Sequence, residues 1–256
     1  MKPRSALAMI CAIGLARSAI GAQASSRPNE LSSAERGAGW RLLFDGKTFA
    51  GWRGLGYDSV PTAHWKIVNG AIEKVSRDDV PKTSDGRPAS GGDLMTVDTF
   101  KDFELAFEWK VTRGANSGVK YNVSEEFSQQ HGSTHAALGY EYQIEDDVNG
   151  DDVSPPSHLT GALYDVFPAS AEKRLNPVGE WNSSRIVFRG NHAEHWLNGK
   201  KIVEFDLGTA RVDSALAKSK YRSIKGFADR RTAHLVLQDH NDEVYFRDIK
   251  VRELKR

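Results

Sequence analysis

Apolar and polar residues alternate along much of the chain after residue 38, and this pattern predicts β-strands. Residues 103–111 show it most clearly, because every second residue is large and apolar while those between are mostly charged. Side chains on a strand alternate between its two faces, so this segment predicts a half-buried antiparallel strand. Its apolar positions are Phe103, Leu105, Phe107, Trp109 and Val111.

Residues 140–145 alternate in the same way, but their polar face is unusual. Aromatic and β-branched residues occupy one face, and the other carries Glu141, Gln143 and Glu145. This row of large hydrogen-bonding side chains has two interpretations. The ordinary one is a polar outer face in solvent. The other is one wall of a groove that binds a polar ligand such as a sugar.

Tight turns separate the strand-like segments. Asn-Gly pairs at 69–70 and 198–199 predict hairpins, because these residues accept the positive φ angles of a type I′ turn. We expect exposed loops at residues 76–92 and 124–138, and a short helix at residues 212–219. Further strands are expected at residues 40–44, 64–68, 71–75, 94–97, 161–165, 185–189, 192–197, 201–205, 234–238 and 244–251.

About a dozen short strands without a long helix predict an all-β fold. Short strands with closely spaced turns are typical of a sandwich or jelly roll built from two antiparallel sheets. The chain shows no internal repeat and no change of composition after residue 31. We therefore expect one domain over residues 38–256.

The N-terminus has the pattern of an export signal. Lys2 and Arg4 precede a mostly apolar run, and Ala22-Gln23-Ala24 matches an A-x-A cleavage site. We therefore expect a signal peptide at residues 1–24, a linker at residues 25–37, and a periplasmic or secreted protein. Cleavage would leave 232 residues without the single cysteine, Cys11, so we expect no disulfide.

Charge gives no sign of a nucleic-acid or membrane partner. The signal peptide carries three of the 35 basic residues, so the mature chain has 32 basic and 34 acidic residues, a net charge of −2. A basic excess would be expected for binding to nucleic acid or to an anionic membrane surface.

Several short phrases, in order along residues 38–254, together resemble the 3-keto-disaccharide hydrolase domain family. This family includes 3-keto-glycoside lyases and hydratases and has a concanavalin A-like jelly roll. Where its members often carry Arg after Asn-Ser-Gly, this chain has Lys120. The phrases are Leu43-Phe44-Asp45-Gly46-Lys47 with Gly51-Trp52, Gly92-Asp93-Leu94, Phe103-Glu104-Leu105, Asn116-Ser117-Gly118, Tyr140-Glu141-Tyr142-Gln143-Ile144, Gly161-Ala162-Leu163-Tyr164-Asp165, Glu180-Trp181-Asn182, His195-Trp196-Leu197-Asn198-Gly199, and Leu237-Gln238-Asp239-His240 with Phe246-Arg247-Asp248-Ile249.

The resemblance implies cleavage of a sugar that carries a ketone at C3. The ketone acidifies the C2 proton, so a base can remove it and the C1 substituent leaves by β-elimination. Water then adds to the unsaturated product in a net hydrolysis. A separate sugar oxidoreductase would have to make the ketone. The site needs a base near C2, a donor near the ketone oxygen and an acid near the leaving oxygen.

The resemblance and the strand pattern together name the candidate residues. Glu141 and His240 are candidates for the base, and Lys120 for polarising the ketone. His195 is a candidate acid if Trp196, its neighbour on the strand, faces the core. Candidates for substrate contacts are Gln143, Gln238, Arg247, Tyr164 and Trp181. A buried hairpin position for His195 and a structural ion pair for Arg247 remain the alternatives.

A calcium ion is a further candidate ligand, and no other cofactor is indicated. Asp147, Asn149 and Asp151 alternate oxygen-bearing side chains as calcium loops do, although the distal glutamate of an EF-hand is missing.

Two other functions fit the same pattern. An ordinary retaining glycosidase would use Glu141 and Glu145 as its two carboxyl groups. Residues four apart on a flat strand lie about 13 Å apart, whereas retaining carboxyl groups need about 5–5.5 Å. A non-catalytic carbohydrate-binding module would need aromatic and amide contacts but no base.

Overall fold

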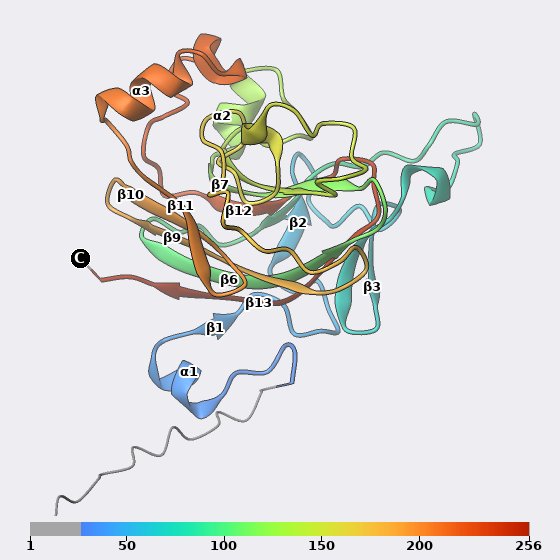
Figure 1. The fold of residues 1–256 in the computed structure, drawn as a ribbon. Coiled ribbons are helices and arrows are strands. Elements are labelled where there is room, and N and C mark those ends of the chain that lie inside the picture. The colour runs from blue at the N-terminus through green and yellow to red at the C-terminus, as the bar shows by residue number, and fades with distance from the viewer. Residues whose placement is uncertain (1–26, 256) are drawn as a thin grey trace, which may run out of the picture.

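Two antiparallel β-sheets pack face to face in the computed structural model, which describes residues 27–255 (Figure 1). The expected signal peptide lies outside the described residues. The larger sheet has the order β11-β10-β9-β6-β13-β4-β3, with β1 also paired to β13. Its strands are β11 (Lys200–Asp206), β10 (His192–Leu197), β9 (Asn182–Arg189), β6 (Phe103–Val111), β13 (Val244–Glu253), β4 (Ala71–Lys74), β3 (Trp65–Val68) and β1 (Arg41–Leu42).

The smaller sheet has the order β2-β5-β12-β7-β8. Its strands are β2 (Trp52–Gly54), β5 (Leu94–Thr96), β12 (His234–Leu237), β7 (Asn116–Val123) and β8 (Tyr140–Glu145). The described residues thus contain thirteen strands, and the all-β sandwich predicted from the alternation is confirmed. Among these residues, no helix has the length and apolar character needed to cross a membrane.

Aromatic side chains fill the space between the sheets. Tyr121 and Tyr140 of the smaller sheet meet Phe188 of the larger one with their rings near perpendicular, at centroid distances of 5.4 and 6.2 Å. Edge-to-face contacts of this kind add about 0.5–1.5 kcal/mol per pair to the burial of apolar area. The predicted alternation of residues 103–111 is correct, since the apolar positions of β6 face this core.

Helices and long loops lie on the outer face of the smaller sheet. Figure 1 shows α2 (Glu125–Gln130) and α3 (Ala210–Leu216) on the side of β7 and β12 that faces away from β6 and β13. The remaining helices are α1 (Ser33–Gly37) and the 3₁₀ turns η1 (Arg77–Asp79), η2 (Pro156–His158) and η3 (Lys220–Ser223). The polar side chains of β8 are buried on the outer face of the smaller sheet, under the helices and loops that lie there.

Local signals predicted the turns better than the loops. Asn69 and Asn198 adopt positive φ angles of 50° and 46° in the β3–β4 and β10–β11 hairpins, as expected. The expected strand at residues 161–165 is instead an irregular segment, in which Leu163 forms isolated bridges with Tyr142 of β8 and with Phe167. The loop predicted at residues 124–138 contains α2, whose first turn Ser124 caps.

The segment predicted as a linker is docked against the larger sheet where it is described. The Asn29 side chain accepts a hydrogen bond from the Asp248 backbone and donates one to the Gly70 carbonyl. Glu35, which completes the expected capping box of α1 with Ser32, also pairs with Lys250 at 2.8 Å. These contacts tie residues 29–37 to β13 and to the β3–β4 turn.

Candidate active site

The polar face of β8 is buried. Tyr140 and Tyr142 point into the core between the sheets, and Glu141, Gln143 and Glu145 point to the outer face of the smaller sheet. The predicted alternation is confirmed, but the solvated-face interpretation is wrong, since these three side chains are only 3%, 1% and 1% exposed. Burial of this many polar groups requires partners from the protein or from a ligand.

Strand β7 supplies the neighbouring row of side chains. Asn116 pairs with Glu145, Gly118 with Gln143, and Lys120 with Glu141 across the ladder. Residues directly opposite on antiparallel strands share a face, so Lys120 and Glu141 are neighbours. A Cβ at Gly118 would lie 2.6 Å from Glu141 Oε1, so the glycine leaves the space that this carboxyl group occupies.

Three buried oxygens on this side of the sheet have no hydrogen-bond partner. They are Gln143 Oε1, Glu145 Oε1 and Gln238 Oε1. The Gln143 amide nitrogen is engaged, since it donates to Glu145 Oε2 at 3.3 Å and to Asn116 Oδ1 at 3.5 Å. Buried acceptors without donors are rare in proteins, and they indicate a site for a molecule that carries several donors.

Two cations lie beside Glu141. Burial would lower the pKa of Lys120, but the Asp93 and Glu141 carboxylates outweigh it and the pKa is raised. Burial raises the pKa of Glu141, while the nearby charges of Lys120 and Lys220 partly oppose that shift. Lys120 is thus a charged donor, and its Nζ lies 3.0 Å from Asp93 Oδ2.

Glu145 has a different environment from Glu141. Burial raises its pKa to about 8, a hydrogen bond from the Asp152 backbone and the charge of His240 oppose this, and the Asp152 and Asp147 carboxylates add to the increase. Within residues 27–255, no lysine or arginine forms an ion pair with this carboxyl group. Glu145 is therefore a protonated acid over much of the neutral range, whereas Glu141 stands among positive charges.

His240 follows β12 and lies at the edge of the same region. Its side chain is about half exposed (51%), with Nδ1 3.8 Å from Asp242 Oδ2. The Asp242 carboxylate raises the pKa of His240, and Glu141 and Glu145 add to the increase. The charges of Glu141 and His240 each favour the charged form of the other, so the two groups lie near one another.

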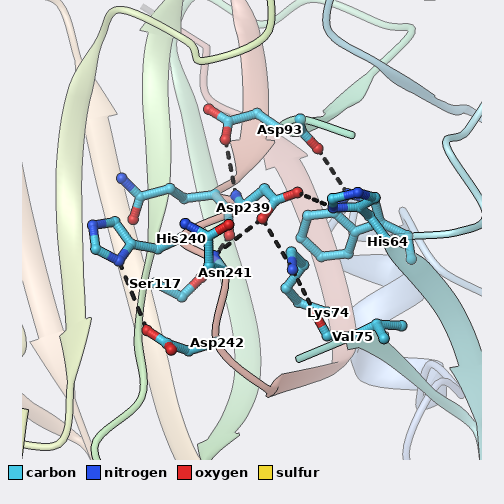
Figure 2. Close-up of polar contacts among 12 residues, drawn as sticks. His64, Lys74, Val75, Asp93, Ser117, Asp239, His240, Asn241 and Asp242 are labelled. Atoms are coloured by element: carbon cyan, nitrogen blue, oxygen red, sulfur yellow. Dashed lines mark hydrogen bonds and ion pairs between the residues drawn. The ribbon is translucent and has the colours of Figure 1, made fainter. Parts of the chain in front are cut away.

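Asp239 turns away from His240 into a buried charge cluster (Figure 2). Its two carboxylate oxygens lie 2.8 Å from His64 Nδ1 and 3.0 Å from Lys74 Nζ, and its backbone N–H donates to Asp93 Oδ1. This cluster joins β3, β4, β5 and β12. It also borders a surface hollow of about 450 Å³ that His64, Gly92, His135 and Asn241 help to line.

Tyr164 belongs to the wall beside Glu141. Its hydroxyl donates to Asp152 Oδ2 at 2.6 Å, and Lys220 Nζ lies 4.0 Å above the centre of its ring. His158 stacks on the same ring and bridges Asp152 and Asp165. The wall thus connects the loop after β8 to the segment around Lys220.

Comparison with known proteins identifies the family. The sequence model of the 3-keto-alpha-glucoside-1,2-lyase-like domain matches residues 39–252. The chain belongs to this family. A 3-keto-disaccharide hydrolase of Bacteroides thetaiotaomicron is 34% identical over 234 residues, which cover 84% of this chain and 79% of that protein.

Solved structures support the same assignment to the 3-keto-alpha-glucoside-1,2-lyase-like family. A protein of Parabacteroides distasonis, provisionally assigned to the glycosyl hydrolases, aligns with 90% of this chain and all of its own at 29% identity and a TM-score of 0.77. A second protein of the same organism and provisional assignment aligns with 84% of this chain and 99% of its own at 25% identity and a TM-score of 0.62. The family resemblance inferred from the sequence phrases is confirmed, and the chain is a carbohydrate-active enzyme.

His195 does not belong to the groove of this family member. It is fully buried between the sheets, where Nε2 bonds the Tyr121 hydroxyl and Nδ1 bonds the Gly161 carbonyl. Burial lowers its pKa to about 4, so it is a neutral core residue at neutral pH. The condition for a groove position of His195, that Trp196 faces the core, is not met, because Trp196 lies on the outer face under Arg185. The alternative of a buried hairpin position for His195 is the correct one.

Arg247 and Trp181 are also misplaced by the sequence interpretation. Both lie on the outer face of the larger sheet, with the Arg247 guanidinium carbon 3.9 Å from the centre of the Trp181 ring. Arg247 Nε bonds Glu108 Oε2 at 2.7 Å. Strand β13 belongs to the larger sheet, whereas the groove lies on the smaller one. The structural alternative for Arg247 is therefore the correct one.

The proposed calcium loop is organised by other contacts. Asp147 accepts the Thr160 backbone N–H and pairs with Lys173 at 2.7 Å, and Asn149 donates its side-chain N–H to Asp146. Asp151 is exposed. The Asp147 carboxylate and the Asn149 amide N–H thus hold the loop together, and the calcium ion stays a prediction.

Sequence reasoning missed Asp93 and Asp239, and it named Glu145 on the polar face of residues 140–145 without a role in the elimination. Asp93 and Asp239 each stand inside a phrase that carried the family resemblance, Gly92-Asp93-Leu94 and Leu237-Gln238-Asp239-His240. Glu145 shares the β8 face with Glu141, which was the available signal. Glu141, Gln143, Lys120, Gln238, His240 and Tyr164 do gather around the outer face of the smaller sheet.

Proposed function

We propose that this protein cleaves 3-keto-glycosides by removing the C2 proton and eliminating the C1 substituent, after which water adds to the product in a net hydrolysis. The observation that carries the proposal is the set of three buried, unpartnered acceptors on Gln143, Glu145 and Gln238 beside Glu141. A sugar supplies several O–H donors within one small molecule. The relative from Bacteroides thetaiotaomicron, described as a 3-keto-disaccharide hydrolase, supports the choice of sugar.

Glu141 is the proposed base. Burial raises its pKa, which makes the carboxylate a stronger base than one in water, while Lys120 and Lys220 keep a fraction of it ionised. The charged Lys120 ammonium stabilises negative charge that develops on the C3 oxygen when the proton leaves. His240, whose pKa is raised, supplies a second positive group at the edge of the site.

The substrate requires an earlier oxidation. A C3 hydroxyl does not acidify the C2 proton, so a separate sugar oxidoreductase must produce the ketone. The export signal expected at residues 1–24 would place the reaction outside the cytoplasm.

A comparison of two substrates tests the function. The purified protein is incubated with 4-nitrophenyl 3-keto-β-glucoside and, separately, with the parent 4-nitrophenyl β-glucoside. Release of nitrophenol from the keto compound alone supports the proposal. Release from the parent glucoside would indicate an ordinary glycosidase, and binding without turnover of either compound would indicate a carbohydrate-binding module; both results contradict the proposal. Glu108→Gln is the matched control for glutamate substitutions in the groove, because Glu108 pairs with Arg247 on the opposite sheet.

A further inference from the structure

We propose that Glu145 is the proton donor to the leaving oxygen at C1, an inference that rests on the function proposed above. The elimination needs an acid at this position unless the leaving group is stable as an anion. His195, the acid expected from the sequence, lies in the core between the sheets and cannot reach the groove. The role therefore requires another residue on the outer face of the smaller sheet.

The placement of Glu145 fits a donor. It stands on the same face of β8 as Glu141, with Gln143 between them. Residues four apart on a flat strand lie about 13 Å apart, so curvature of β8 and the length of both side chains must bring the two carboxyl groups onto one sugar. Its Oε2 accepts the Gln143 amide N–H at 3.3 Å, while its buried Oε1 has no partner. An ionised carboxylate here would place a charge among other unpaired acceptor oxygens. A protonated carboxyl group instead turns one of these three acceptors into a donor.

The surroundings of the two glutamates divide their roles. Glu141 lies beside Lys120, Lys220 and His240, whose charges favour the carboxylate. Neither glutamate forms an ion pair with a lysine or arginine in the part of the chain that the structure describes. The Asp152 and Asp147 carboxylates disfavour the charged form of Glu145, while a hydrogen bond from the Asp152 backbone and the charge of His240 oppose them in part. Pairs of carboxyl groups with such opposed environments act as base and acid in many enzymes. The pKa of Glu145, about 8, agrees with this division.

The loop after β8 closes over Glu145. A Cβ built at Gly150 would lie 1.7 Å from Glu145 Oε1, so only a glycine permits the loop to pack this closely on the carboxyl group. Exclusion of water from this end of the site keeps the proton on Glu145 until a substrate oxygen arrives.

The proposed step balances as follows. The C2–H bond breaks, Glu141 takes the proton, and the electron pair forms the C1=C2 double bond. The C1–O1 bond breaks with its pair on O1, which takes the proton of Glu145 and leaves as an alcohol. Glu145 ends as a carboxylate and Glu141 as a carboxylic acid. Proton exchange with water restores both groups.

Leaving-group dependence tests this role. Glu145→Gln is compared with the wild type on methyl 3-keto-β-glucoside, whose alkoxide needs a proton, and on the 4-nitrophenyl compound, whose phenolate does not. We expect turnover of the methyl compound to fall by about 10²- to 10⁴-fold, and turnover of the 4-nitrophenyl compound to stay within a few-fold. The basic limb of the wild-type pH profile on the methyl compound should also disappear in this variant.

His240 is the rival donor, because its imidazolium lies near the same groove. His240→Gln should lower the turnover of the methyl and the 4-nitrophenyl compound by similar factors. The inference is overturned if Glu145→Gln affects the two substrates equally, or if the leaving-group selectivity appears in His240→Gln. Unchanged circular dichroism and melting temperature exclude misfolding, and Glu145→Asp, which keeps the acid, should restore part of the methyl turnover. Failure of the wild type on both keto compounds would instead refute the function itself.

Discussion

At the scale of single residues, the charges around each carboxyl group separate chemistry from packing. Glu141 and Glu145 both lie on the outer face of β8, yet lysine charges act on the first and two aspartate carboxylates act on the second. His195 shows the opposite case, a titratable group that serves only the core.

Glu141→Gln tests the assignment of the base. We expect kcat on a 3-keto-glucoside to fall by about 10²- to 10⁴-fold with the fold intact, because the amide cannot accept the C2 proton. His240→Ala should lower kcat by a smaller factor, since His240 contributes charge from the edge. Wild-type activity would decline as the pH falls through the raised pKa of Glu141. Wild-type rates in both variants would show that the base lies elsewhere.

His195→Phe tests the structural role of the buried imidazole. The ring volume is kept, but the Tyr121 hydroxyl and the Gly161 carbonyl lose their partner. Each unsatisfied buried group costs about 1–3 kcal/mol, so urea unfolding should show a clear loss of stability. The rate per folded molecule should stay near that of the wild type. A large fall in kcat without a loss of stability would restore His195 to the catalytic site.

The position of His195 was predictable from its own strand. Ala193 and Leu197 share its face, whereas Glu194 and Trp196 share the other, so apolar neighbours marked the core side. The sequence left open whether the core side is taken by His195 or by Trp196. Its ring lies under Arg185 on the outer face, where a cation covers it.

At the scale of elements, the β7–β8 ladder builds the floor of the site. Gly118→Ala should displace the Glu141 carboxyl group, because the new Cβ would meet Oε1 at 2.6 Å. We expect kcat to fall by more than tenfold with little change in melting temperature, since a strand accepts alanine readily. Steady-state kinetics and thermal unfolding of the two proteins measure both quantities. Unchanged kcat would mean that the position of Glu141 is not critical.

The turn between β12 and β13 depends on the Asp239 cluster. Asp239→Asn leaves Lys74, only 1% exposed, without a counter-charge, and breaking such a buried pair costs about 3–5 kcal/mol. Chemical denaturation of the two proteins at several pH values measures the difference. A loss below 1 kcal/mol at every pH would show that the cluster is not a structural ion network.

The stability difference between the wild type and Asp239→Asn depends on pH because the fold shifts the pKa values of Asp239 and His64. Burial would raise the pKa of Asp239, but His64 and Lys74 lower it overall, so its contribution is lost as the pH falls through the lowered pKa. The bond to Asp239 raises the pKa of His64, so that contribution is full below about 6.5 and is lost as the pH rises through the raised value. The advantage of the wild type over Asp239→Asn should therefore be largest between about pH 4 and 6.5.

At the scale of the whole molecule, period-two patterning and turn residues predicted the sandwich, since both are local signals. Which sheet each strand joins depends on long-range pairing, and that information is absent from the alternation. Arg247 and Trp181 were therefore assigned to the groove, although both lie on the outer face of the larger sheet. The burial of Glu141 and Glu145 could not be predicted either, because it arises from loops that are distant in sequence.

The docking of the N-terminal segment gives a test at this scale. A chain that begins at residue 25 should keep the contacts of Asn29 with Asp248 and Gly70 and the pair between Glu35 and Lys250. A chain that begins at residue 38 loses all of them. Each hydrogen bond contributes about 0.5–1.5 kcal/mol, so the shorter chain should be less stable by about 2–4 kcal/mol in urea unfolding. Asn29→Ala in the longer chain should account for part of that loss.

Equal stability of the two chains would mean that residues 25–37 act as the linker expected from their composition. The groove lies on the opposite sheet, so kcat should be the same in both chains at temperatures where both are folded.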